Sequence, residues 1–206
     1  MRKLVIAFTA ALAVAVLTVG VAAGLGLSDV EISGKKLVVK DNSAKGKPNS
    51  AVFKSTDPNF MAIGFDPTVT GATFQLINPV PGVASSVFSM PAGNWSLKKG
   101  KFFYKDKDLS EGPVKFAQLK DGGVKIILKG GDFSLAGAPL GEVGGIVTFP
   151  QPALTASVSR PNGGAIFVNR ICFLFPGSQG EVKKDTTKLY KARNAEAPGF
   201  CPGILT

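Results

Sequence analysis

The sequence contains no histidine, and this absence excludes several kinds of chemistry at once. Ser-His and Cys-His nucleophile pairs and His-ligated metal centres all need an imidazole, so this chain of 206 residues cannot form any of these sites. Cysteine is scarce as well, because the two that are present cannot complete a thiolate metal site without further ligands. Paired carboxylates are therefore the remaining route to catalysis.

The carboxylates that stand close together in the sequence are better explained as turn residues. Asp106 and Asp108 are two residues apart, so on a strand they would share a face and could serve acid–base catalysis or bind Ca²⁺. Their polar, glycine-containing surroundings instead favour a turn, as do the Asp-Pro pairs that begin at Asp57 and Asp66. We therefore expect no enzyme activity, no cofactor and no metal.

Arginine is rare although the chain is strongly basic. Without Arg2 and Lys3, 22 basic and 14 acidic residues remain, a net charge of +8, and only Arg160, Arg170 and Arg193 are arginines. Proteins that read nucleic acid rely heavily on the planar arginine side chain, so we expect no nucleic-acid partner. Lysines alternate with apolar residues, as in 124–129, which favours a solvated sheet face. The alternative is a surface for an anionic partner.

The N-terminal segment is typical of a secretory signal peptide. A basic start is followed by a long uncharged apolar run, and Val21, Ala22 and Ala23 place small residues before Gly24. This pattern predicts a signal helix in residues 1–23, cleavage before Gly24 and a single mature domain of residues 24–206. The apolar run is also long enough for an uncleaved membrane anchor, which stays the alternative. With cleavage, the protein is exported, periplasmic, cell-surface or extracellular, and does not touch the membrane.

The two cysteines, Cys172 and Cys201, fit the same compartment. An even number of cysteines in an exported chain predicts a disulfide. Cys172 lies in the most apolar stretch of the mature chain and Cys201 in a tail rich in Pro and Gly, so the bond would hold an irregular C-terminus against a core strand. Two free thiols, one of them buried, are the alternative.

Beyond the signal segment the chain lacks helical periodicity, and period-two alternation is common. Asp121-Gly122 stands between two alternating runs, which predicts a hairpin with a type I′ turn and positive φ at both residues. About ten short strands separated by turn residues predict an all-β protein, either an antiparallel β-sandwich or a barrel. The expected strands cover residues 36–40, 51–54, 72–77, 86–90, 101–105, 114–120, 123–129, 145–149, 153–158, 165–175 and 188–192.

Residues 34–54 and 100–116 are similar to each other. Each segment has a Gly-Lys start, an alternating strand that ends in Lys-Asp, then a Gly, a Pro and a strand of apolar residues and lysine. Two copies of a strand–turn–strand unit would suit a pseudo-symmetric sandwich. A chance match within a lysine-rich β-protein is the alternative.

Several short motifs also occur together in a known group of proteins. Asn94-Trp95, Gly100 to Asp106 and Gly112 to Lys115 follow one another within residues 32–175. In this respect the chain resembles uncharacterised exported bacterial all-β proteins, in which a Trp strand, a Tyr-Lys-Asp strand and a Gly-Pro-apolar-Lys hairpin occur in that order. The resemblance implies export and an all-β fold, and it implies no activity.

Two functions from different classes follow. The first is an exported, non-catalytic structural or interaction domain, with a protein or a cell-envelope polymer as its partner. The alternative is a binding module for sugars or anionic envelope polymers that uses Trp95, Tyr104 and the lysine-bearing faces. A lone Trp in a small β-domain otherwise anchors the core, so the exposure of Trp95 distinguishes the two.

Overall fold

The computed structural model describes residues 29–62, 66–77, 86–131, 133, 141–150, 169–175, 180–198 and 201. The predicted signal segment, residues 1–23, and the predicted strand 153–158 lie outside this part of the chain. None of the helices within the described ranges combines the length and the apolar character that crossing a membrane requires.

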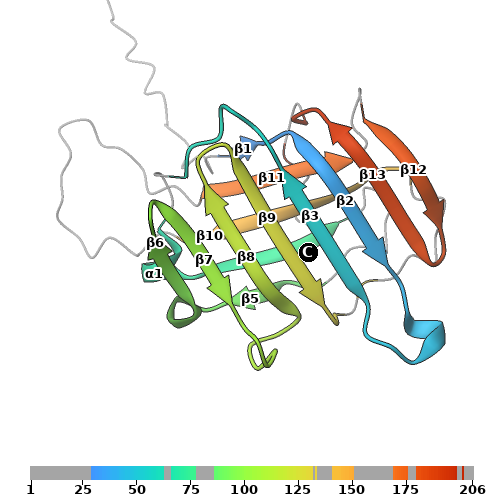
Figure 1. Ribbon diagram of the computed structural model, residues 1–206, viewed down its shortest axis with the longest axis horizontal. Coiled ribbons are helices and arrows are strands. Elements are labelled where there is room, and N and C mark those ends of the chain that lie inside the picture. The colour runs from blue at the N-terminus through green and yellow to red at the C-terminus, as the bar shows by residue number, and fades with distance from the viewer. Residues whose placement is uncertain are drawn as a thin grey trace, which may run out of the picture.

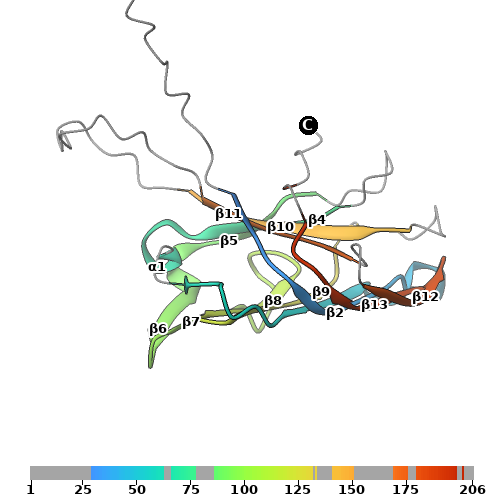
Figure 2. The same cartoon turned by 90° about the horizontal axis from the view of Figure 1, so that it is seen from above.

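The protein is a β-sandwich made of two separate sheets that pack face to face (Figure 2). Of the two architectures predicted from the sequence, this is the sandwich. The five-stranded sheet has the order β1-β11-β10-β4-β5, and the eight-stranded sheet has the order β12-β13-β2-β3-β9-β8-β7-β6. Neighbouring strands are antiparallel except β1 and β11, which are parallel.

The strands of the two sheets cross obliquely when the sandwich is viewed through its layers (Figure 1). The five-stranded sheet consists of β1 (Asp29–Glu31), β4 (Ala72–Ile77), β5 (Phe88–Met90), β10 (Val143–Phe149) and β11 (Asn169–Phe175). The eight-stranded sheet consists of β2 (Gly34–Lys40), β3 (Ser50–Ser55), β6 (Trp95–Lys98), β7 (Lys101–Lys105), β8 (Val114–Lys120), β9 (Gly123–Lys129), β12 (Glu181–Thr186) and β13 (Leu189–Ala195).

Helical structure in the described residues is limited to single turns. The α-helix α1 (Pro67–Thr70) begins at Asp66, whose carboxylate accepts a hydrogen bond from the Thr68 amide at 3.0 Å. The 3₁₀ turns are η1 (Ser43–Lys45) and η3 (Ala92–Asn94). The expectation that Asp66 starts a turn is therefore confirmed.

The core lies between the sheets because most strands of the larger sheet alternate apolar and polar residues. In β9, Val124, Ile126 and Leu128 are buried, while the intervening side chains are half-buried or exposed. The rings of Phe53 on β3 and Phe173 on β11 stack across the layers with their centroids 3.4 Å apart. This contact joins an interior strand of one sheet to an interior strand of the other.

The smaller sheet is buried on its inner face and on part of its outer face, where Thr73 and Thr148 remain half-buried and Ser89 is exposed. The inward side chains of β4, such as Phe74, and its outward Ile77 are both almost inaccessible to solvent. On the outer face, Ile77, Ile146 and Cys172 form a small apolar cluster against which Cys201 packs. Cys201 is bonded to Cys172, so the predicted disulfide is confirmed, and with it the attachment of the C-terminal tail to a core strand.

Most predicted strands are present with nearly the predicted limits. The limits of β4, β7, β8 and β9 match the prediction, while β5 is shorter and β2, β3, β10 and β13 are longer. The alternation rule missed β1, β6 and β12. Those strands have three, four and six residues, and the last of them is almost entirely polar.

The predicted hairpin exists, but its turn is of a different type. Lys120 pairs with Gly123, and Gly122 has a φ of +75°, whereas Asp121 keeps a negative φ. This is the φ pattern of a type II turn, so the prediction of type I′ is wrong. Hydrogen bonds to a distant segment of the chain fix this turn: the Asp121 carboxylate accepts from the Ala62 amide at 2.8 Å, and the Gly122 amide donates to the Phe60 carbonyl.

The two similar segments, 34–54 and 100–116, occupy comparable places in the larger sheet. The first contains the antiparallel pair β2–β3 and the second reaches from β7 into β8, which also pair antiparallel. Strand β9 lies between the two pairs in the sheet order. The β2–β3 pair has a register shift between Gly34 and Lys36, whereas the β7–β8 pair has none; the shift between Val114 and Phe116 lies in the pairing of β8 with β9.

Candidate anion-binding face

The two aromatic residues predicted to bind a ligand lie in the core. Trp95 is 7% exposed, and its indole Nε1 donates to the Met90 carbonyl at 3.1 Å. Tyr104 is fully buried, and burial raises the pKa of its hydroxyl. The two residues are opposite each other on β6 and β7, with ring centroids 5.4 Å apart. The structure thus corrects the ligand-binding interpretation, because neither ring presents a free face on which a sugar could stack.

The candidate carboxylate pair is not brought together either. Asp106 is buried, and its two oxygens accept from the amides of Ser110 at 3.1 Å and Glu111 at 2.9 Å, while Asp108 is exposed. Asp57 has the same kind of role, accepting from the Asn59 amide at 3.0 Å, and it also accepts from the distant Ser33 amide at 2.8 Å. These carboxylates close turns. Among the described residues, no three acidic or cysteine side chains are grouped so as to hold a metal ion.

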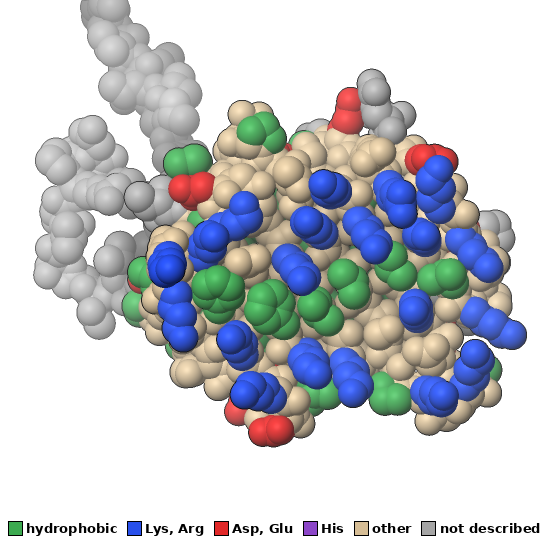
Figure 3. Space-filling model, in the orientation of Figure 1, with side chains coloured by type: hydrophobic (Ala, Val, Ile, Leu, Met, Phe, Trp, Pro, Cys, Tyr) green, Lys and Arg blue, Asp and Glu red, His purple; other side chains and the backbone are tan. Residues whose placement is uncertain are grey.

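The distinctive surface of the molecule is the outer face of the larger sheet. Figure 3 shows lysine and arginine side chains spread over this whole face, with a line of apolar side chains through its middle. Seven of its eight strands contain no Asp or Glu; the exception is β12. All the cations of these seven strands are exposed or half-exposed: Lys35, Lys36, Lys40, Lys54, Lys98, Lys101, Lys105, Lys115, Lys120, Lys125, Lys129, Lys191 and Arg193.

Strand register brings four of these cations into one line across the sheet. Arg193 is opposite Lys36, Lys36 is opposite Lys54, and Lys54 is opposite Lys125. We call these four residues the cationic row. Among the described residues, none of the four has a carboxylate within 4.0 Å. Like charges directly opposite each other destabilise a sheet, so Lys36, Lys54 and Lys125 repel one another, while Arg193 at the end of the row also has Glu181 opposite it on β12.

An apolar line runs beside the cationic row. Val38, Val52, Ile127 and Phe116 are opposite one another on β2, β3, β9 and β8, and all are half-buried. We call these four residues the apolar stripe. The ammonium group of Lys125 lies over the Phe116 ring at 5.5 Å from its centroid, so the stripe and the cationic row touch.

A second line of cations lies on the other side of the stripe. Lys40 and Lys129 are both opposite Ser50, one on each side of it. We call Lys40 and Lys129 the flanking lysines. They stand four residues further along β2 and β9 than Lys36 and Lys125 of the cationic row, which corresponds to about 13 Å along a strand.

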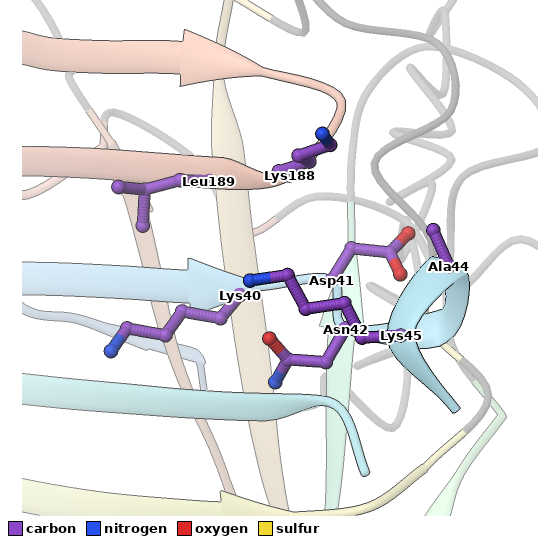
Figure 4. Close-up of a pocket in the computed structure, with 7 residues that line it drawn as sticks. All are labelled: Lys40, Asp41, Asn42, Ala44, Lys45, Lys188 and Leu189. Atoms are coloured by element: carbon purple, nitrogen blue, oxygen red, sulfur yellow. The ribbon is translucent and has the colours of Figure 1, made fainter. Parts of the chain in front are cut away.

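Two hollows open along the seam between β2 and β13. One has a volume of about 360 Å³ and is lined by Lys35, Lys36, Lys54, Arg193 and Asn194. The other has a volume of about 330 Å³ and is lined by Lys40, Asp41, Asn42, Ala44, Lys45, Lys188 and Leu189. Figure 4 shows that the lysines of the second hollow come from the end of β2, from η1 and from the turn before β13. Each hollow therefore gathers at least three cations from separate segments.

Two β-bulges add to the exposed charge. In each bulge one strand has an extra residue, Lys35 in β2 and Lys115 in β8, and both lysines are exposed. A bulge interrupts the alternation of faces and so allows neighbouring residues such as Lys35 and Lys36 both to reach solvent. Alternation alone could not locate these positions.

Sequence reasoning identified the solvated lysine face and missed its arrangement. The pattern of β9 indicated that its lysines point outward, yet only the strand order shows that Lys125 is level with Lys54 and Lys36. Comparisons of the chain with protein-family models, with curated proteins and with solved structures found no match. The resemblance to exported bacterial β-proteins therefore remains a prediction.

Proposed function

We propose that this protein is an exported, non-catalytic interaction domain that binds an anionic polymer through the outer face of its eight-stranded sheet. The observation that carries the proposal is the set of thirteen cations on seven strands that contain no acidic residue. A surface of one sign produces a positive potential that attracts polyanions and speeds their association. The Cys172–Cys201 disulfide supports an oxidising compartment outside the cytoplasm.

The arrangement of the charges favours a polymer over a small ligand. The cationic row spans β13, β2, β3 and β9, and its members Lys36, Lys54 and Arg193 line one of the two hollows. The other hollow is separate and lies along the same seam. A small anion would contact only one of these places. A chain of anions would neutralise several opposed lysines together and relieve the repulsion between them.

The burial of Trp95 removes one of the two binding modes expected from the sequence, which is stacking of sugars on exposed aromatic rings. With Trp95 and Tyr104 in the core, a binding mode based on their stacking against sugars is not available. The interaction function then depends on the charged face.

The test measures binding of the purified protein to dextran sulfate and to uncharged dextran. We expect binding to dextran sulfate that weakens steeply as salt is added, because salt screens exposed charges, and no binding to uncharged dextran. The row variant carries Lys36→Gln, Lys54→Gln and Lys125→Gln. The control variant carries Lys98→Gln, Lys107→Gln and Lys183→Gln, which remove the same net charge from exposed positions outside the cationic row.

The expected order of affinity for dextran sulfate is parent, then control variant, then row variant. Equal binding of the parent to charged and uncharged dextran at low salt would overturn the proposed function.

A further inference from the structure

The apolar stripe is the feature of the charged face that general attraction to polyanions does not explain. A surface that only collects negative charge has no need for a continuous apolar line between its cations. The stripe crosses four adjacent strands, a length of about 14 Å at the usual strand separation. It is flanked by the cationic row on one side and by the flanking lysines on the other.

The stripe is flat. Its four residues are half-buried, and the large apolar side chains that do protrude in the described residues are Met61, Val69, Val87, Leu97 and Val182, none of which belongs to it. The stripe continues sideways from Phe116 to Phe103, whose ring centroid lies 6.4 Å away. A ligand on this surface would therefore lie along it without inserting into it.

We infer that the ligand is a linear acidic polysaccharide, which lies along the apolar stripe and across the strands. This inference rests on the proposed function and names the ligand class. Sugar rings have faces of C–H groups, which would cover Val38, Val52, Ile127 and Phe116. The charged substituents at the two edges of the chain would reach the cationic row on one side and the flanking lysines on the other.

Other polyanions fit this surface less well. Polyphosphate has no apolar face and gains nothing from the stripe. A membrane surface is held by apolar side chains that insert between lipids, and the stripe offers none that protrude. Nucleic-acid binding proteins favour arginine, while the cationic row contains three lysines and a single arginine, Arg193.

The experiment compares three probes with the parent protein and two variants. The probes are polymannuronate oligomers of increasing length, polyphosphate, and vesicles that contain phosphatidylglycerol. The stripe variant carries Val52→Thr and Ile127→Thr, which keep the β-branched shape while making the stripe more polar. The second variant is the row variant defined above, and far-ultraviolet circular dichroism checks that both variants are folded.

The stripe variant gives the decisive result. We expect its affinity for polymannuronate to fall about fivefold, since methyl groups that a sugar face covers are replaced by hydroxyls, and its affinity for polyphosphate to stay unchanged. The row variant should lose affinity for both polymers by about tenfold or more, because several ion pairs disappear together. Affinity for polymannuronate should rise with oligomer length until the oligomer spans the four strands.

The possible failures are distinguishable. If polyphosphate or the vesicles bind as tightly as polymannuronate, or if the stripe variant loses affinity for all probes equally or for none, the polysaccharide inference is overturned while the proposed function stands. If no anionic probe binds, both are overturned.

Discussion

The two sheets of the sandwich share one core but differ in their outer faces. The outer face of the smaller sheet carries Ile77, Ile146 and Cys172, each at most 3% exposed, and the tail residue Cys201 packs against them. The outer face of the larger sheet carries thirteen cations around a half-buried stripe. Part of the outer face of the smaller sheet is thus covered by the protein's own chain, whereas the outer face of the larger sheet is charged and open to solvent.

The difference extends to the forces within each sheet. The smaller sheet is held by packing on both sides and by a covalent bond to the tail. The larger sheet keeps opposed lysines that weaken it. Changes to the outer face of the smaller sheet should therefore cost stability, while neutral substitutions in the cationic row should increase stability and reduce binding.

The largest effect is expected from removing the disulfide with Cys201→Ser. The bond closes a segment of 29 residues, and its loss should lower the free energy of unfolding by about 3.5 kcal/mol through the added entropy of the unfolded chain. Urea denaturation of the parent and the variant measures this change. An unchanged midpoint would show that the tail contributes nothing to the smaller sheet.

A smaller loss is expected from Gly145→Ala in β10. A Cβ atom at this position would overlap the ring of Phe173, which stacks against Phe53 of the other sheet. The ring would have to move, so we expect a loss of about 1–3 kcal/mol from overpacking. The matched control is Gly93→Ala, because a Cβ atom at Gly93 meets open space and Gly93 does not have a positive φ. Gly46→Ala would not serve, because Gly46 has a φ of +60° and any side chain there would be strained. Equal losses in both variants would contradict the packing explanation.

The two buried tyrosines, Tyr104 and Tyr190, allow a prediction of how stability changes in alkali. The Tyr190 hydroxyl on β13 donates to the Phe175 carbonyl on β11 at 2.7 Å, and burial raises the pKa values of Tyr190 and Tyr104 above the ordinary 10.0. Below pH 10 both tyrosines are protonated in the folded and in the unfolded protein, so the stability that comes from burying the neutral hydroxyls is fully present. Above pH 10 the unfolded chain releases protons that the folded protein retains, so stability should fall as pH rises.

Phenolate absorbance measures this effect, because the chain contains only these two tyrosines. Ionisation should begin above the ordinary pKa and coincide with loss of the β-sheet circular dichroism signal. Ionisation near pH 10 with the fold intact would show that the two hydroxyls are accessible to solvent.

The smallest effect is a gain from Lys54→Gln at the centre of the cationic row. Lys54 is opposite both Lys36 and Lys125, so its neutralisation should raise the free energy of unfolding by about 0.5 kcal/mol at low ionic strength. The gain should shrink in concentrated salt, which already screens the repulsion. Lys107→Gln, in a loop outside the row, serves as the control. A loss of stability in Lys54→Gln would contradict the contrast between the two sheets.

Parts of the fold could be predicted because they depend on local pattern. The strands β4, β7, β8 and β9 follow from alternation, and the hairpin between the last two follows from Asp121-Gly122. The turn type could not be predicted, because Asp121 bonds to Ala62, 59 residues away. The role of Trp95 was likewise undecided until the partner strand placed Tyr104 against it on the inner side of the sheet.

By itself, the sequence determined that histidine chemistry is excluded, that the chain forms strands, and that lysines occupy one face of several of them. These properties depend on residue types and on a period of two, which a linear pattern contains in full. Only the tertiary structure decided that Arg193, Lys36, Lys54 and Lys125 form one row beside an apolar stripe. The reason is that strand order and register are set by contacts between segments far apart in the chain, including Phe53 with Phe173, and alternation within one strand carries no information about its neighbour.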